Sequence, residues 1–354
     1  MRDVIGQRRL LEKLGAQAVR GDVAQGYELS GPRSIGKHTV ALRLAQTLNC
    51  SAEPRVSGGC GTCLNCTKIE KGIHPDVLMV ERLVDQVEQR GERKGEKKAD
   101  LKKISIEQIR AMQQDLALRP LEGRKRIVLI DDAAELSEHA EVALLKTLEE
   151  PPSHAVLLLI TPTPSRLLET IRSRIQPLPL RLVARAEIED ALTKRFGPAA
   201  AKYAAVAAGK PGIALTLASD EASRSVRSAL EKEFYELVAS RLTERFAWAA
   251  DLADSERDTQ RRNEQIESRL VQWGELLRDA AVVAAGAPER ATRPERTAQT
   301  NKLAAGVPQR ELVDLAQSFE RWRRDVVETT VSARMLLELL ALKLPYRADV
   351  GATA

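Results

Sequence analysis

The chain has 354 residues, which is too long for one compact core and predicts two or three domains. Hydrophobic residues make up 43% and charged residues 30%, as in ordinary globular proteins, and no apolar run approaches the length of a membrane span. The N-terminus lacks the basic, apolar and small-residue regions of a secretory signal, so we expect a cytoplasmic protein without a membrane partner.

A phosphate-binding loop is predicted between a short strand, 27–30, and a helix, 40–48. Its residues run Gly31-Pro32-Arg33-Ser34-Ile35-Gly36-Lys37, which matches the pattern Gly, four residues, Gly, Lys. In that pattern glycines turn backbone N–H groups around phosphate oxygens, and the lysine adds a positive charge.

The residue after the loop lysine normally carries the hydroxyl that binds Mg²⁺, but here it is His38. Imidazole is a poor ligand for that hard cation, and Thr39 is one residue out of phase on the helix. The sequence therefore favours phosphate-loop ancestry and leaves ATP and Mg²⁺ as doubtful ligands of this site.

All four cysteines of the chain lie close together, at Cys50, Cys60, Cys63 and Cys66. The last three are separated by two residues each, the spacing of a closed Cys₄ zinc site. Disulfides suit small secreted proteins better than a large cytoplasmic one. We expect a structural Zn²⁺ module over residues 50–66, and the alternative is a set of unpaired buried thiols.

The positive charge of the chain is local. Its formal net charge is +5, and residues 90–103 alone hold seven basic and three acidic side chains. Residues 81–103 are interpreted as a solvated, mobile insertion, with a weak electrostatic contact to nucleic acid or an acidic partner as the alternative. Aromatic residues make up only 3% and offer few stacking platforms for single-stranded nucleic acid.

A strand-helix-strand unit is predicted over residues 126–174. The apolar run 127–130 is typical of a strand buried on both faces, and it ends in Asp131 and Asp132. Ser137 is a good helix N-cap, Pro151-Pro152 ends that helix, and a second buried strand follows over 155–161. Such units close into a parallel sheet whose ligands bind at the carboxyl ends of the strands. A helix expected from Pro164 brings Arg172 and Arg174 to its end.

Beyond Arg174 the composition changes. Pro177 and Pro179 predict an extended connector, and helical patterns follow. We expect a small bundle over 184–218, long helices over 222–250, 260–285 and 308–344, and a loop over 286–302. The predicted domains are an α/β domain over 1–178, a small helical lid over 179–221, a helical oligomerisation domain over 222–345 and a tail over 346–354.

Together these features resemble the clamp-loader ATPases of the AAA+ class, and among them the delta-prime-type subunits of the bacterial DNA polymerase III clamp loader. The motifs that carry the resemblance are Val4-Ile5-Gly6-Gln7, the loop 31–37, the four cysteines, His74-Pro75-Asp76, Asp131-Asp132, the run 143–152 and Arg172-Ser173-Arg174. The resemblance implies a P-loop α/β domain of the AAA+ type with the zinc module inserted, an all-α lid and an all-α collar domain.

Three departures from the motor subunits of that family lie at positions that serve ATP hydrolysis. His38 replaces a hydroxyl residue, Asp132 replaces a glutamate, and Gly212 stands where the lid of a motor subunit carries an arginine. Ser173 and Arg174 are intact. The resemblance implies that this pair lies at a subunit boundary, where the arginine enters the ATP site of the neighbour.

The expected protein is therefore a non-motor subunit of a hetero-oligomeric ring. The resemblance implies gamma/tau-type motor subunits and a delta-type subunit as partners, and the sliding clamp and primed DNA as targets of the complex. Polymerase activity would belong to the assembly, and we expect little or no ATPase activity of the chain itself. The alternatives are an active motor subunit or a zinc-module protein that binds nucleic acid. For Arg174 alone, the alternative is a cation that stabilises a helix C-terminus.

Overall fold

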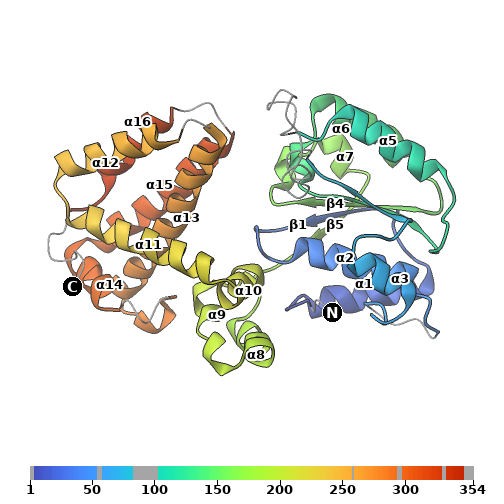
Figure 1. Ribbon diagram of the computed structural model, residues 1–354, viewed down its shortest axis with the longest axis horizontal. Helices are drawn as coiled ribbons and strands as arrows, with labels where there is room; N and C mark the ends of the chain where they lie inside the picture. The colour runs from blue at the N-terminus through green and yellow to red at the C-terminus, as the bar shows by residue number, and fades with distance from the viewer. Residues whose placement is uncertain are drawn as a thin grey trace. The chain divides into compact units, whose positions relative to one another are not determined.

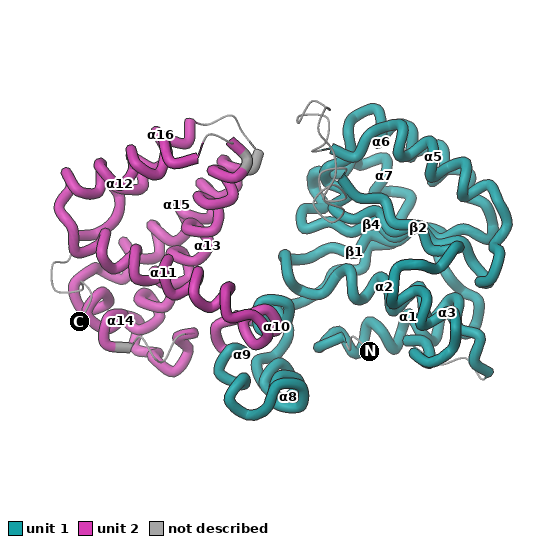
Figure 2. Tube along the Cα trace, viewed as in Figure 1, with its two compact units in different colours: residues 1–204, 209–214 teal, residues 205–208, 215–354 magenta. Residues whose placement is uncertain are grey.

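The computed structural model describes residues 4–53, 58–82, 103–256, 259–292, 297–328 and 332–346. They form two compact units (Figure 2): unit 1 comprises residues 1–204 and 209–214, and unit 2 comprises residues 205–208 and 215–354. The charged insertion expected over 81–103 and the tail expected over 346–354 lie almost entirely outside the described residues. The division into three domains stays a prediction.

Unit 1 is built on a parallel sheet of five strands in the order β2-β3-β4-β1-β5. The strands are β1 Gly26–Ser30, β2 Val77–Val80, β3 Arg126–Ile130, β4 Ala155–Thr161 and β5 Gln176–Pro179. The expected parallel sheet is thus confirmed, and β3 and β4 are buried along their whole length, as their unbroken apolar runs predict. Because all strands run the same way, β1 and β3 end at the same edge as the central strand β4.

Helices cover both faces of this sheet (Figure 1). One face carries α1 Arg8–Arg20, α2 Lys37–Asn49 and α3 Leu64–Glu70, and the other carries α5 Ile106–Ala117, α6 Glu138–Glu149 and α7 Glu169–Arg172. Ser137 caps α6 by accepting the N–H of Ala140, as expected, and Ser105 forms a capping box with Gln108 at the start of α5. These caps position the helices that line the carboxyl edge.

The helix expected from Pro164 is shorter than predicted. Residues Pro164–Arg166 form a 3₁₀ turn, and α7 begins only at Glu169. Leu167 separates the two with an extended backbone, which lets its side chain be buried in the core of this face. Burial of one leucine therefore interrupts the helical pattern.

The edge strand β5 contains two prolines. It pairs with β1 in register Glu28 to Pro177 and Ser30 to Pro179, and the N–H of Leu180 donates to Ser30 O at 2.7 Å. Because N–H groups alternate in direction along a strand, Pro177 and Pro179 occupy the positions that face away from β1. The missing proline N–H groups thus cost β5 no pairing with β1.

Short helices follow the sheet: α8 Arg185–Phe196, α9 Tyr203–Val206 and α10 Pro211–Ser219. The turn before α10 contains Gly209, whose backbone is left-handed at φ 81°. Its carbonyl accepts the N–H of Val183 at 2.9 Å. A Cβ at Gly209 would lie 2.9 Å from Leu182 Cβ, so this close approach requires glycine.

Unit 2 is entirely helical in its described residues. Its helices are α11 Glu221–Ala239, α12 Leu242–Ser255, α13 Thr259–Ala284, α14 Thr297–Gly306, α15 Gln309–Glu328 and α16 Ala333–Lys343. One hydrophobic core joins them, with Trp273 and Phe234 fully buried at its centre. Trp322, expected in the core, is partly buried and packs against Phe319.

The guanidinium of Arg245 links two helix ends within unit 2 by hydrogen bonds. It is 3% exposed and donates to carbonyl oxygens at the C-termini of α11 and α16. The acceptors are Leu237, Val238 and Ser240 at the end of α11, and Ala341, Leu344 and Pro345 at the end of α16. A buried cation without a carboxylate partner is here satisfied by the carbonyls that a helix end leaves unpaired.

Three element boundaries in unit 2 differ from prediction. The helix expected over 222–250 is interrupted at Ser240 and Arg241, where the N–H of Arg241 donates to Glu244 and begins α12. The helix expected over 308–344 is two helices, α15 and α16. The loop expected over 286–302 gives way to α14 from Thr297. Helical periodicity continued across both interruptions, so spacing alone did not reveal them.

Among the described residues, no helix has both the length and the apolar composition needed to cross a lipid bilayer.

Candidate functional site

The predicted phosphate loop lies between β1 and α2. Its backbone is left-handed at Ser34 (φ 61°) and Gly36 (φ 98°), and α2 begins directly afterwards at Lys37. A Cβ added at Gly36 would meet nothing within 4 Å, so the loop is open at that point. Such a turn before a helix N-terminus aims backbone N–H groups at an anion. The backbone therefore fits a phosphate group.

Lys37 is folded back onto its own loop. Its Nζ donates to Gly31 O at 2.7 Å and to Pro32 O at 2.9 Å, and the residue is 9% exposed. Burial lowers the pKa of Lys37 to about 8, although the negative charges of Asp132 and Asp131 oppose the shift. A phosphate would have to replace these two carbonyl contacts to engage the ammonium.

Asp131 and Asp132 follow β3 at the carboxyl edge of the sheet. Asp132 has a left-handed backbone (φ 52°), and its N–H donates to Asp131 Oδ1 at 3.0 Å. Burial raises the pKa of Asp132, while Arg33 of the phosphate loop opposes the shift from 3.9 Å. The structure thus brings one predicted carboxylate to the phosphate loop. His38, in the first turn of α2, offers imidazole where Mg²⁺ needs oxygen, so the side chains fit that cation poorly.

The lid turn, defined here as Gly209–Gly212, also contacts the phosphate loop. The N–H of Gly212 donates to Ser34 O at 2.8 Å, and a Cβ added at Gly212 would lie 2.8 Å from the same oxygen. An arginine at this position therefore requires the turn to move away from the loop. The backbone around Gly212 therefore accommodates glycine and no larger residue.

Thr161 is a residue of this edge that sequence reasoning missed. It ends β4, pairs in register with Ser30 and is completely buried. Its Oγ1 accepts the N–H of Thr163 at 3.1 Å. The available signal was a single hydroxyl residue at the end of the apolar run 155–161.

Ser173 and Arg174 lie just beyond α7, away from the phosphate loop in their contacts. Arg174 Nη1 donates to Thr170 O at 2.8 Å and to Ser173 Oγ at 3.3 Å, and Nη2 donates to Glu149 Oε1 at 2.9 Å. The Arg174 side chain is 36% exposed. The contact with Thr170 O is what a helix-capping cation makes, and the exposed donors remain available to a ligand or partner.

Arg172 has a different environment, as its spacing from Arg174 predicts. Its Nε lies 3.8 Å from Oε2 of Glu28, a buried carboxylate of β1. The Arg172 side chain is 48% exposed, and its ion pair is with a carboxylate of its own sheet, unlike that of Arg174.

The four cysteines form a second cluster in unit 1. Their sulfur atoms all lie within 4.8 Å of one another, and Cys50 Sγ is 4.0 Å from Cys63 Sγ. Four thiolates around a tetrahedral Zn²⁺ lie about 3.8 Å apart, given a Zn–S bond of about 2.3 Å. No disulfide joins them, and Cys50 and Cys66 are buried. The cluster could hold a metal ion, and the donor set is the one that zinc prefers.

Backbone N–H groups point at the sulfur atoms of this cluster. Cys60 N donates to Cys50 Sγ at 3.4 Å, Cys63 N to Cys60 Sγ at 3.3 Å and Cys66 N to Cys63 Sγ at 3.4 Å. N–H donation from Thr62 and Cys63 lowers the pKa of Cys60 to about 6, whereas burial raises the pKa of Cys66. Such donors hold metal ligands in place and stabilise the thiolate form.

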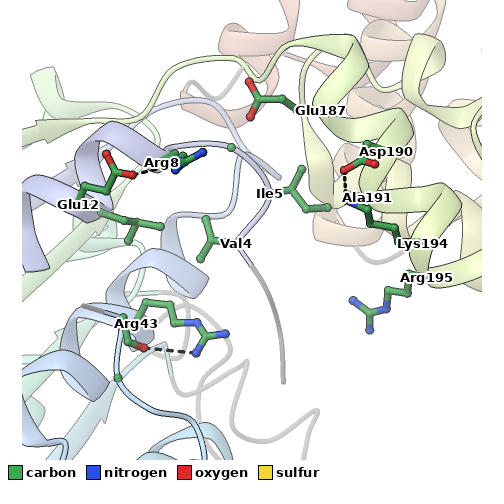
Figure 3. A pocket seen from close by; sticks show the side chains of 14 residues that line it. Val4, Ile5, Arg8, Glu12, Arg43, Glu187, Asp190, Ala191, Lys194 and Arg195 are labelled. Atoms are coloured by element: carbon green, nitrogen blue, oxygen red, sulfur yellow. Dashed lines mark hydrogen bonds and ion pairs between the residues drawn. The ribbon is translucent and has the colours of Figure 1, made fainter. Parts of the chain in front are cut away.

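Unit 1 also contains a cleft of about 1060 Å³ (Figure 3). Val4 and Ile5 line it from the N-terminal segment, Arg43 from α2, and Asp190 and Lys194 from α8. Asp190 and Lys194 form an ion pair with each other at 2.6 Å. The cleft includes the predicted motif at 4–6 but none of the residues of the phosphate loop.

The parallel sheet, the phosphate loop and the carboxylates at the sheet edge define an α/β domain of the P-loop class. Comparison with known proteins identifies the family. A model of the family described as "DNA polymerase III, delta subunit" matches residues 6–184, which is half of the chain. The chain belongs to this family, and its resemblance to delta' subunits makes it a clamp-loader subunit of the delta' type.

Individual relatives carry two kinds of subunit name. The delta' subunit of Bacillus subtilis is 30% identical over 69% of this chain and 69% of its own length, and that of Pseudomonas aeruginosa is 34% identical over 58% of each. The gamma subunit of Buchnera aphidicola is 32% identical over 53% of this chain and 46% of its own length. The chain spans from about a quarter to about half of the length of the gamma and tau subunits that it matches.

Proposed function

We propose that this chain is a non-motor subunit of the bacterial DNA polymerase III clamp loader, which loads the sliding clamp on primed DNA. It takes its place in a hetero-oligomeric ring beside motor subunits of the gamma/tau type and a delta-type subunit. Its own phosphate site contributes little hydrolysis, and Arg174 enters the ATP site of a neighbouring motor subunit. Zn²⁺ on the four cysteines holds residues 50–66 together.

The observation that carries this proposal is the contact between Gly212 and Ser34. The position at which a motor subunit needs an arginine is occupied by a glycine whose backbone bonds the phosphate loop. His38 and Asp132 add two further changes at the same site. ATP bound there would bring phosphates to backbone N–H groups and Lys37. The residue that follows Lys37, His38, has no hydroxyl for Mg²⁺, and the hydroxyl of Thr39 is one residue out of phase on α2.

Arg174 is suited to act on a neighbour because its side chain is 36% exposed and its hydrogen bonds to Thr170, Ser173 and Glu149 engage only three of its five N–H donors. Phosphoryl transfer is catalysed by positioning and by stabilisation of the charge that develops, and an arginine supplied in trans accelerates it by roughly 10³ to 10⁵. Arg174 would hold the γ-phosphate oxygens, while Ser173 and the carbonyl of Thr170 fix the guanidinium from its own side. A subunit without its own chemistry can thus control that of another.

The test is reconstitution of the complex from motor subunits and either the wild-type chain or Arg174→Ala. We expect assembly to be preserved, with clamp loading lost and ATP turnover reduced. Full loading activity with Arg174→Ala would overturn the proposal. Arg172→Ala is the matched control, because Arg172 pairs with a buried carboxylate of its own sheet and should leave turnover unchanged in complexes that assemble.

An active motor subunit is the second candidate, because several relatives are named gamma or tau subunits. The discriminating measurement is ATP turnover by the isolated chain. We expect none above background. Magnesium-dependent hydrolysis that disappears in Lys37→Ala would establish the motor role instead.

A further inference from the structure

We propose that Glu149 is the positioning residue for Arg174, the arginine finger that enters a neighbour's ATP site. Glu149 orients the guanidinium of Arg174 before Arg174 contacts the phosphate of the neighbour. The inference rests on the proposed role of Arg174 in trans and deepens it. Glu149 is the last residue of α6, and Arg174 lies two residues beyond the end of α7. Their side chains meet at 2.9 Å between Nη2 and Oε1.

The guanidinium is held from two sides. Thr170 O and Ser173 Oγ accept from Nη1, and Glu149 Oε1 accepts from Nη2. An arginine has five N–H donors in one plane, so these three acceptors leave at least two donors for other oxygens. Two donors in a fixed plane are what a bidentate phosphate contact requires. Glu149 therefore restricts the orientation of the plane without consuming the donors that the reaction needs.

The position of Glu149 in its helix is unfavourable without this contact. The C-terminus of a helix carries partial negative charge and disfavours carboxylates, yet α6 ends in Glu149 and is followed by Glu150. Arg174 neutralises Glu149 in the described structure, whereas no ion pair involves Glu150 among the described residues. The contact with Arg174 thus offsets the local cost at Glu149 alone.

The ion pair between Glu149 and Arg174 is strong enough to orient the guanidinium but too weak to keep it from ATP. Glu149 is 53% exposed and Arg174 36% exposed at the side chain, and ion pairs this open to water are weak. Glu149 can reduce the orientations that Arg174 samples, but it cannot compete with the multiple negative charges of ATP for the guanidinium. Loss of Glu149 should therefore slow the neighbour's hydrolysis and should not release extra activity.

The experiment compares the part of ATP turnover that depends on Arg174, measured in the reconstituted complex with clamp and primed DNA. For the wild type and for each Glu149 variant, this part is the measured turnover minus the turnover of Arg174→Ala. Glu149→Ala should lower it roughly two- to five-fold through kcat, with KM for ATP unchanged, because the finger acts in the transition state. Glu149→Gln should keep an intermediate value, because an amide oxygen still accepts one hydrogen bond.

Two controls make the result specific. Glu150→Gln removes the same charge one residue away and should leave turnover unchanged. The double variant Glu149→Ala/Arg174→Ala should be no slower than Arg174→Ala, because Glu149 acts only through Arg174.

The failures of the two proposals differ. Wild-type turnover in Arg174→Ala overturns the proposal that Arg174 acts in the ATP site of a neighbouring subunit. A clear loss in Arg174→Ala overturns the role of Glu149 alone if Glu149→Ala retains full turnover, if Glu149→Ala is faster than wild type, or if the double variant is slower than Arg174→Ala.

Discussion

The backbone N–H of Gly212 lies 2.8 Å from the carbonyl oxygen of Ser34, which joins the lid turn to the phosphate loop by one direct hydrogen bond. Ser34 itself is left-handed, at φ 61°. This contact requires that the residue at 212 have no side chain. Any larger residue at this position would force the lid turn and the phosphate loop apart.

Gly212→Ala should therefore destabilise unit 1. The added Cβ would lie 2.8 Å from Ser34 O, a backbone atom that cannot rotate away, so we expect the free energy of unfolding to fall by about 1 to 3 kcal/mol. Calorimetric unfolding of the whole chain measures the effect. Gly212→Arg should show the same loss and gain no ATPase activity, because the side chain cannot be added without displacing the turn.

Gly274→Ala is the matched control for that substitution. Gly274 lies inside α13, and its added Cβ would be 3.7 Å from Phe319 Cβ, an ordinary contact. Alanine favours helix over glycine by up to about 1 kcal/mol, so this variant should be slightly more stable than the wild type. Equal stability of the Gly212→Ala variant and the wild type would show that the Gly212 contact is dispensable.

The cysteine cluster predicts a zinc content of one ion per chain, measured by elemental analysis of the purified protein. Structural zinc sites of this type contribute on the order of 10 kcal/mol of binding free energy, which becomes folding free energy. Chelation should therefore lower the thermal midpoint of unfolding and expose four reactive thiols. Cys66→Ser should lose the metal, whereas Leu64→Ala, between the cysteines but 66% exposed and without a ligand atom, should keep it. A metal-free protein that does not respond to chelator would favour unpaired thiols.

Replacing Arg245 should lower the stability of unit 2 and leave that of unit 1 unchanged. Arg245→Met leaves buried carbonyls at two helix ends without donors, and we expect a loss of about 3 kcal/mol or more. All three tryptophans, at 248, 273 and 322, lie in unit 2, so tryptophan fluorescence during urea unfolding reports on that unit. Arg334→Ala, which breaks an exposed pair with Glu338, should change stability by less than about 0.5 kcal/mol.

Asp76 predicts a pH dependence of stability below neutrality. Burial alone would raise its pKa, but N–H donation from Gly123, Leu121 and Glu122 at 2.7 Å outweighs this, so the pKa of Asp76 is lowered in the folded state. The unfolded chain then binds more protons near pH 4, so the contribution of Asp76 is complete above the unfolded value of about 3.9 and is lost as pH falls through the folded value.

Asp76→Asn should remove that part of the pH dependence. The variant should lose about 2 kcal/mol or more at pH 7, because one amide cannot replace a carboxylate that accepts three N–H groups. Urea unfolding at intervals from pH 7 to pH 2 measures both effects. Asp115→Asn, an exposed carboxylate on α5, is the control and should retain the wild-type slope; an identical slope in Asp76→Asn would contradict the assignment.

The sequence predicted those features that depend on composition and short spacing. The apolar runs at 127–130 and 155–161 gave the central strands, because such runs bury both faces in a parallel sheet. Cysteine spacing predicted a cluster whose sulfurs do lie together. Ser137 was identified as a cap from its residue type and position alone.

Contacts between residues that are far apart along the chain could not be predicted from the sequence. Glu149 and Arg174 are 25 positions apart, and nothing in either segment marks them as partners before the helices are packed. Gly212 could be recognised as an altered position, but its approach to Ser34 depends on the path of the connector between them. The interruption at Ser240 and Arg241 was missed because two polar residues carry little weight inside a helical pattern.

The two prolines of β5 limit how any other protein can use this rim of unit 1. An exposed strand edge offers a row of N–H and C=O groups with which a strand of another chain can pair, and such pairing commonly leads to aggregation. Pro177 and Pro179 remove the N–H groups on the outward side, so the sheet ends here. The outward carbonyl groups of Pro177 and Pro179 can still accept hydrogen bonds, but a docking subunit finds no N–H donors there and cannot form a regular β-ladder with β5.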